Sequence, residues 1–92
     1  MGIFSDFAIF HTKHPEVYIN LVKLARDLKA RGHAKGGIGM LWEVLRWQWF
    51  MTRDADEDFK LNNNYRSHYA RFIMDNEADL KGFFDLRELR AA

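Results

Sequence analysis

The stretch from Lys60 to Arg71 carries the side chains best suited to binding another molecule. It holds no acidic residue, and it combines three cations and a histidine with asparagines and a serine. Such side chains hydrogen-bond base edges and phosphates, and a helix N-terminus attracts anions. The sequence therefore predicts a nucleic-acid-binding helix. The expected base contacts are Asn63, Asn64, Ser67 and Arg71. The expected backbone contacts are Lys60, Arg66 and His68.

The small residues Ser67 and Ala70 would let this helix lie deep in the major groove of double-stranded DNA. The composition is that of a recognition helix in a helix-turn-helix protein. The connection from Met51 to Asn62 is far longer than the usual three- to four-residue turn, so only a variant of that motif would fit. The alternative is an ordinary solvated helix face preceded by an asparagine cap.

A second basic run follows in the first half of the chain. Its members are Lys23, Arg26, Lys29, Arg31, His33 and Lys35. Arg31 and Lys35 could extend the nucleic-acid patch with phosphate contacts, which add affinity without sequence information. The alternative is a solvated helix face whose basic end complements the helix dipole.

The residue types needed for catalysis or metal binding do not form a recognisable set. His11 and His14 stand three apart, but Pro15 separates them from Glu16, and there is no cysteine to complete a zinc site. We expect His14 to cap the helix that follows it. The glycine-rich segment lacks the spacing of a phosphate-binding loop. The sequence therefore predicts no catalytic residue, no metal and no cofactor.

The element that must position the basic helix is the apolar stretch from Ile38 to Met51. It reads IGMLWEVLRWQWFM, and ten of its fourteen residues are apolar. A helix that is apolar nearly all round must be covered on most sides. It is too short to cross a bilayer, which takes about 20 apolar residues. We expect it to be the central core helix.

The three tryptophans of this stretch point in different directions. Trp42 and Trp49 lie seven residues apart on one side of the helix, and Trp47 is turned toward another side. This distribution favours packing against several neighbours rather than an aromatic cage around one ligand. An exposed tryptophan would instead mark a partner-binding position, because tryptophan is enriched in interface hot spots.

Helical periodicity and caps define the other elements. A short helix from Ser5 to about Lys13 has Phe4, Phe7 and Phe10 on one edge. The next helix begins at Pro15 and stops at Gly32, which can take up the left-handed cap conformation.

The second half of the chain holds a third long helix. It begins after one of Asn62, Asn63 or Asn64 and runs to about Asn76, with Tyr65, Tyr69, Phe72 and Ile73 toward the core. A shorter helix over Glu77–Phe84 is interrupted near Gly82. Phe59, Leu61, Leu86 and Leu89 are expected to pack back onto the core.

Length and composition limit the fold class. The chain has 92 residues, a net charge of +1, no cysteine and 15% aromatic residues. We expect a single helical domain over residues 1–92. It should be an all-α bundle of four or five helices around the central Trp-rich helix, and one possible arrangement of this bundle is helix-turn-helix-like. The lack of cysteine suits a reducing cytoplasm, and no signal peptide or membrane contact is expected.

Four segments resemble a group of small, uncharacterised bacterial and bacteriophage-encoded proteins. They are FHTKHPEVY (10–18), LWEVLRW (41–47), DFKLNNNY (58–65) and YAR (69–71). The chain departs from the pattern at His14, where asparagine is more frequent. The resemblance implies a setting, the cytoplasm of a bacterial host cell, and no activity.

The first functional interpretation is a phage-type accessory protein that binds double-stranded DNA. The main alternative is a non-enzymatic protein that binds or inhibits a host or defence protein, or pairs with its own copy as a homodimer. A third is a small virion or assembly component. None of these is an enzyme.

Overall fold

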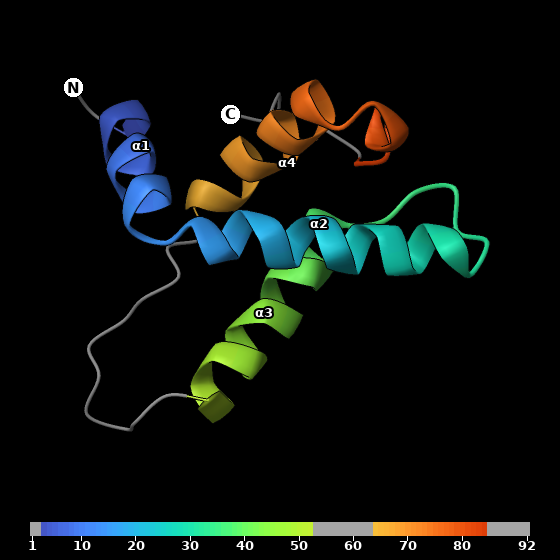
Figure 1. Ribbon diagram of the computed structural model, residues 1–92, viewed down its shortest axis with the longest axis horizontal. Coiled ribbons are helices and arrows are strands. Elements are labelled where there is room, and N and C mark those ends of the chain that lie inside the picture. The colour runs from blue at the N-terminus through green and yellow to red at the C-terminus, as the bar shows by residue number, and fades with distance from the viewer. Residues whose placement is uncertain (1–2, 53–63, 85–92) are drawn as a thin grey trace.

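The protein is all-α, as the sequence predicts. The computed structural model describes residues 3–52 and 64–84. Its helices are α1 (Ile3–Lys13), α2 (Pro15–Ala30), α3 (Ile38–Thr52) and α4 (Asn64–Asn76), followed by one 3-10 turn, η1 (Ala78–Leu80). In Figure 1, α2 runs across the molecule, α1 and α4 lie above it, and α3 leaves it below.

Several sequence expectations lie outside the described residues. They concern Lys60 and Asn63 of the expected nucleic-acid contacts, and the apolar residues Phe59, Leu61, Leu86 and Leu89.

The boundaries of α2 follow from its terminal residues. Pro15 occupies the first helical position, where its missing N–H costs nothing. At the other end Gly32 has a φ of 100°. Its N–H donates to the carbonyl of Lys29 (3.0 Å) and the N–H of His33 donates to that of Leu28 (3.1 Å). These two bonds satisfy carbonyls that the helix end would otherwise leave open, so the glycine stop is confirmed.

One core joins the described helices. Its two largest fully buried side chains, Trp42 of α3 and Tyr69 of α4, have ring centroids 5.8 Å apart. The other buried residues are Val17, Leu21, Val22, Ala25, Ile38, Leu41, Leu45, Ala70, Ile73, Leu80, Phe83 and Phe84. The core positions predicted on α4 at Tyr69 and Ile73 are thereby confirmed.

The segment after α4 differs from the expected short helix. Only η1 is helical, and Gly82, with a φ of 75°, turns the chain so that Phe83 and Phe84 enter the core. The N–H of Gly36 donates to the carbonyl of Phe83 (3.1 Å), and Gly36 forms an isolated parallel bridge with Phe84. Burying these two rings together with Leu80 requires a reversal that a continuous helix would not allow.

The prediction that α3 is covered on most sides is wrong: one face is buried as far as Leu45, but Met40 and Val44 are already exposed in its first half. The fully buried residues of α3 end at Leu45. Figure 1 shows the second half extending beyond α2, α1 and α4. Helix α2 crosses α3 near its start, so the later turns have less of the neighbouring helices to pack against.

Candidate interaction surfaces

Helix α4 is held on two sides by aromatic rings. Phe7 of α1 meets Tyr69 edge-on at 4.8 Å and stacks against the ring of His68 at 5.1 Å. On the other side Tyr69 contacts Trp42 of α3. Tyr18 of α2 lies 5.0 Å from Phe72. Contacts with three helices leave only one narrow face of α4 toward solvent.

That open face carries Asn64, Ser67, Arg71 and Asp75. Asn64, Arg71 and Asp75 are exposed, and Ser67 is half-buried. Their spacing of three and four residues places them on one stripe of the helix. Three of the expected base contacts therefore share the solvent side, and an acidic residue continues the same stripe.

The remaining expected contacts of α4 lie on its flanks. The guanidinium of Arg66 lies toward α3, 3.6 Å from where a side chain on Gly39 would begin. His68 is half-buried against Phe7. Ala70 is fully buried, so the expectation that it lets the helix enter a groove is wrong. Because α4 packs through Tyr69, Ala70 and Ile73, its small residue serves close packing inside the protein.

Two members of the second basic run, Arg26 and Lys29, bind the segment after α4 at Glu77 and Asp79, and we call this set of contacts the clamp. Arg26 donates to the Glu77 carboxylate at 2.7 Å and to both oxygens of Asp79 at 3.0 Å. Lys29 donates to the backbone carbonyl of Asp79. The Arg26 guanidinium bonded to Asp79 lowers the pKa of that carboxyl group. These cations fasten α2 to the segment after α4.

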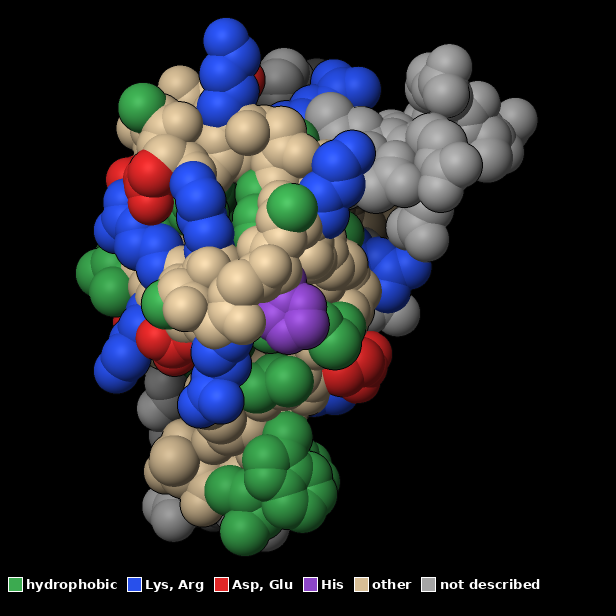
Figure 2. All heavy atoms as spheres, turned by 90° about the vertical axis from the view of Figure 1, so that its right-hand side faces the viewer, with side chains coloured by type: hydrophobic (Ala, Val, Ile, Leu, Met, Phe, Trp, Pro, Cys, Tyr) green, Lys and Arg blue, Asp and Glu red, His purple; other side chains and the backbone are tan. Residues whose placement is uncertain are grey.

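All six members of the run are exposed, and the four outside the clamp are Lys23, Arg31, His33 and Lys35. Figure 2 shows Lys and Arg side chains spread over this face of the molecule, with Asp and Glu side chains between them. Arg31 and Lys35 follow the end of α2, and acidic groups interrupt the positive surface.

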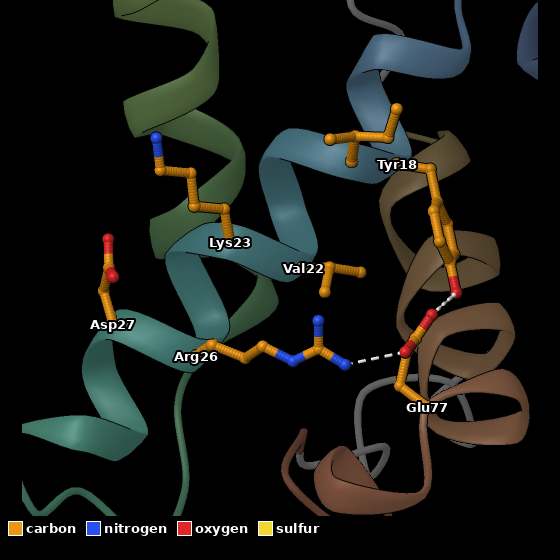
Figure 3. A pocket seen from close by; sticks show the side chains of 7 residues that line it. Tyr18, Val22, Lys23, Arg26, Asp27 and Glu77 are labelled. Atoms are coloured by element: carbon orange, nitrogen blue, oxygen red, sulfur yellow. Dashed lines mark hydrogen bonds and ion pairs between the residues drawn. The ribbon is translucent and has the colours of Figure 1, made fainter.

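The clamp borders a shallow groove of about 370 Å³ between α2 and the end of α4. In Figure 3, Tyr18 and Arg26 both point toward Glu77, whereas Lys23 and Asp27 point away from it. The Tyr18 hydroxyl donates to Glu77 at 2.7 Å. Burial, together with this bond to a carboxylate, raises the pKa of Tyr18 to about 12. Tyr18, Arg26 and Glu77 bind one another, which makes this side of the groove a structural joint between elements.

The histidines near Pro15 have structural contacts. His14 precedes α2, but its side chain makes no hydrogen bond to the backbone there. His14 is therefore the N-cap residue of α2, as predicted, without a side-chain cap bond. The ring nitrogen of His14 lies 3.3 Å from the Glu16 carboxylate instead. His11 packs edge-on against Phe72 at 5.1 Å. Within the described residues, no three metal-ligating side chains gather at one place.

Five of the seven large hydrophobic side chains that are exposed among the described residues lie on α3, a helix that the sequence predicted to be covered. We call these five side chains the α3 stripe: Met40, Val44, Trp47 and Met51, with Phe50 at its edge. Their exposed fractions are 53%, 37%, 64%, 64% and 79% respectively. Figure 2 shows a hydrophobic cluster at the lower end, where α3 extends away from the rest of the molecule.

The α3 stripe lies on the side of the helix opposite its buried residues. Spacings of four, three and four residues place Met40, Val44, Trp47 and Met51 on one line, whereas Leu41 and Leu45 face the core. A fully exposed aromatic side chain presents roughly 150–250 Å², so Trp47 and Phe50 alone expose roughly 210–360 Å², and Val44 and the two methionines bring the stripe to roughly 500 Å². The largest apolar patch of a typical monomeric protein has about this size and is often functional.

The charged residues beside the α3 stripe pair with each other. Arg46 lies one turn after Glu43, and their side chains are 3.3 Å apart. The stripe itself carries no charged residue. The spacing of Met40, Val44, Trp47 and Met51 is visible in the sequence. Because the helix is apolar nearly all round, the sequence does not show which of its sides remains exposed.

Comparison of the chain with protein-family models, with curated proteins and with solved structures gives no match. Among the described residues, no helix is both long enough and apolar enough to cross a membrane.

Proposed function

We propose that this protein is a non-enzymatic interaction module that binds a protein through the α3 stripe. The single observation that carries the proposal is the exposure of Trp47, Phe50 and Met51 on one projecting helix end. Tryptophan and phenylalanine supply large apolar contact area, and interfaces concentrate their binding energy in such residues. The expected resemblance to bacteriophage-encoded proteins supports a role in a bacterial host cell, where the partner would be a host protein, a phage protein or another copy of the chain.

The non-enzymatic part of the proposal is supported by the groove beside α2. Three of its polar residues, Tyr18, Arg26 and Glu77, are engaged with one another by hydrogen bonds and an ion pair. A catalytic group must instead reach a substrate at hydrogen-bond distance.

Site-specific photo-crosslinking tests this function. A photoreactive phenylalanine analogue replaces Trp47 in one variant and Ile19 in the control, and both are illuminated in bacteria that produce the protein. Ile19 is a suitable control because its exposed fraction, 62%, is close to the 64% of Trp47, but it lies on α2. We expect adducts from position 47 and none from position 19. Illumination without any adduct at position 47 would refute the proposal.

A second candidate function is DNA binding through α4, and it is favoured by the solvent-facing stripe of Asn64, Ser67 and Arg71. It ranks second for two reasons. Asp75 lies on the same stripe, and Arg26 and Lys29 are engaged with the segment after α4. A role as a virion component is a third form of interaction protein, and only the resemblance supports it.

Binding to a mixed-sequence duplex at about 50 and about 200 mM salt tests this candidate. Six or more phosphate contacts would reduce the affinity on the order of a thousandfold, because the released counterions rebind at high salt. Arg71→Ala and Arg66→Ala should each weaken binding several-fold, and Lys23→Ala on α2 is the control. The absence of binding at the lower salt concentration would eliminate the DNA hypothesis.

A further inference from the structure

The partner of the α3 stripe can be inferred from its own pattern, on the premise of the proposed function that the stripe binds protein. We propose that it is a second copy of this chain, with the two α3 helices antiparallel about a two-fold axis. A two-fold contact uses the same patch on both subunits, so the patch must complement itself. The α3 stripe can be tested for this property residue by residue.

The spacing of the α3 stripe matches the contact positions of a coiled coil. Met40, Val44, Trp47 and Met51 occupy alternating intervals of four and three residues, as the two core positions of a heptad do. In an antiparallel pair each core position faces the other type on the partner helix. Val44 then faces the partner's Trp47, and Met40 faces the partner's Met51.

The volumes of the facing residues agree with this arrangement. Across each central pair a small side chain, Val44, meets a large one, Trp47, and the terminal pairs join two flexible methionines, which adapt to irregular gaps. In a parallel pair the two Trp47 side chains would face each other and the two Val44 side chains would face each other, although the helices are equally far apart at both positions. The antiparallel register therefore fills the interface evenly.

The apolar area of the stripe is at the lower limit for a specific interface. Burial of roughly 500 Å² on each copy gives about 1,000 Å² in total, the size of a weak dimer, and the residues beside the stripe would add to it. No charged residue lies in the stripe, and Glu43 beside it is paired with Arg46 of its own helix. Nothing in the stripe thus selects a partner of opposite charge, whereas an uncharged apolar helix of matching pattern is present in every copy.

The position of the stripe leaves room for a second copy. The second half of α3 extends away from the other described helices (Figure 1), so the bodies of two antiparallel copies would lie at opposite ends of the shared helix pair. In a two-fold contact both copies use the same patch, so no patch remains for a third copy and assembly stops at the dimer.

Sedimentation equilibrium of the full chain from about 5 to about 500 μM tests the inference. The chain has a mass of 10.9 kDa, and we expect the measured mass to double as concentration rises. Trp47→Glu should remain near the monomer mass throughout, because it buries a charge in the contact. Ile19→Glu is the matched control and should still dimerise. Circular dichroism of each variant verifies that the helices are retained. A wild-type chain that stays monomeric would overturn the inference.

A charge-pair experiment tests the antiparallel register. Val44→Lys and Trp47→Asp each place one charge type in the interface and should each reduce dimerisation at least tenfold when alone. Mixed together, they should form a heterodimer, because Lys at 44 then faces Asp at 47 of the other chain. Failure of the mixture to associate would overturn the antiparallel register.

The outcome also separates this inference from the proposed function. If the wild-type chain is monomeric but photo-crosslinking at position 47 captures another protein, the second-copy inference fails while the interaction function stands. If neither gives a complex, both fail.

Discussion

At the scale of single residues, Gly36 is the described glycine with the least space for a side chain. A methyl group there would lie 2.8 Å from a ring carbon of Phe83 and 3.0 Å from a methyl carbon of Leu28. Phe83 is buried, so its ring cannot swing into solvent. We expect Gly36→Ala to lower the free energy of unfolding by about 1–3 kcal/mol through overpacking. Urea unfolding followed by circular dichroism measures this change.

Gly39 provides the control of opposite sign. It lies in the first turns of α3, and a methyl group there would meet only the Arg66 guanidinium at 3.6 Å, an ordinary contact. Alanine loses less conformational freedom than glycine in a helix, so Gly39→Ala should raise the free energy of unfolding by about 0.5–1 kcal/mol. Equal effects of the two substitutions would contradict the packing described around Gly36.

At the scale of elements, α3 has two faces with different energetic roles. Trp42 is fully buried, whereas Trp47 is 64% exposed. Trp42→Ala should cost about 3–5 kcal/mol, a large part of the stability of a small domain. Trp47→Ala should leave the stability of the isolated subunit within about 0.5 kcal/mol. Unfolding at low protein concentration compares the two, and a large loss at Trp47 would mean that this side chain is packed.

The clamp between α2 and η1 makes stability depend on pH. The pKa of Asp79 is lowered by its hydrogen bonds from Arg26. The folded state therefore favours the ionised carboxylate. That contribution is present above the ordinary aspartate pKa of about 4 and is lost as the pH falls through the lowered value.

Asp79→Asn tests this linkage. We expect the variant to melt below the wild type at neutral pH, with a difference that shrinks as the pH is lowered below about 4. Asp75→Asn removes an exposed carboxylate of α4 and controls for general charge effects. A difference between wild type and Asp79→Asn that grows in acid would show that the clamp does not stabilise the fold.

The elements themselves were largely predictable, because local signals determine them. Pro15 and Gly32 bound α2, and the periodic apolar residues mark the inward faces of α2 and α4. The segment after Asn76 was harder to predict. Its reversal at Gly82 depends on a bridge to Gly36, which is distant in sequence. Local sequence patterns do not predict the contact between Gly36 and Phe84.

At the scale of the whole molecule, dimerisation would link stability to concentration. Ligand binding to the folded state stabilises it by mass action, and a second copy is such a ligand. Each tenfold rise in concentration should raise the Tm by about 3–6 °C for a dimer of this size. Trp47→Glu should melt at a temperature independent of concentration. Calorimetry over a hundredfold range of concentration makes the comparison, and a wild-type Tm that does not move would argue against dimerisation.

The candidate site was less predictable than the fold, and the reason is tertiary. The sequence shows that α3 is apolar all round, but it does not show how far α2 and α4 reach along it. The crossing of the helices leaves Trp47 exposed. It also turns Ala70 inward, although its neighbours Ser67 and Arg71 reach solvent. The orientation of a helix decides such assignments, and its composition alone does not.

The three tryptophans occupy three environments, and this makes the chain its own optical reporter. Trp42 is fully buried, Trp49 is half-buried with its ring 5.5 Å from that of His14, and Trp47 lies in solvent. Fluorescence from Trp47 should appear at the red edge of the emission spectrum and be quenched by iodide, whereas the blue emission of Trp42 should resist it. Any partner that covers the projecting end of α3 would shift that red emission to shorter wavelengths, so binding can be followed without a label.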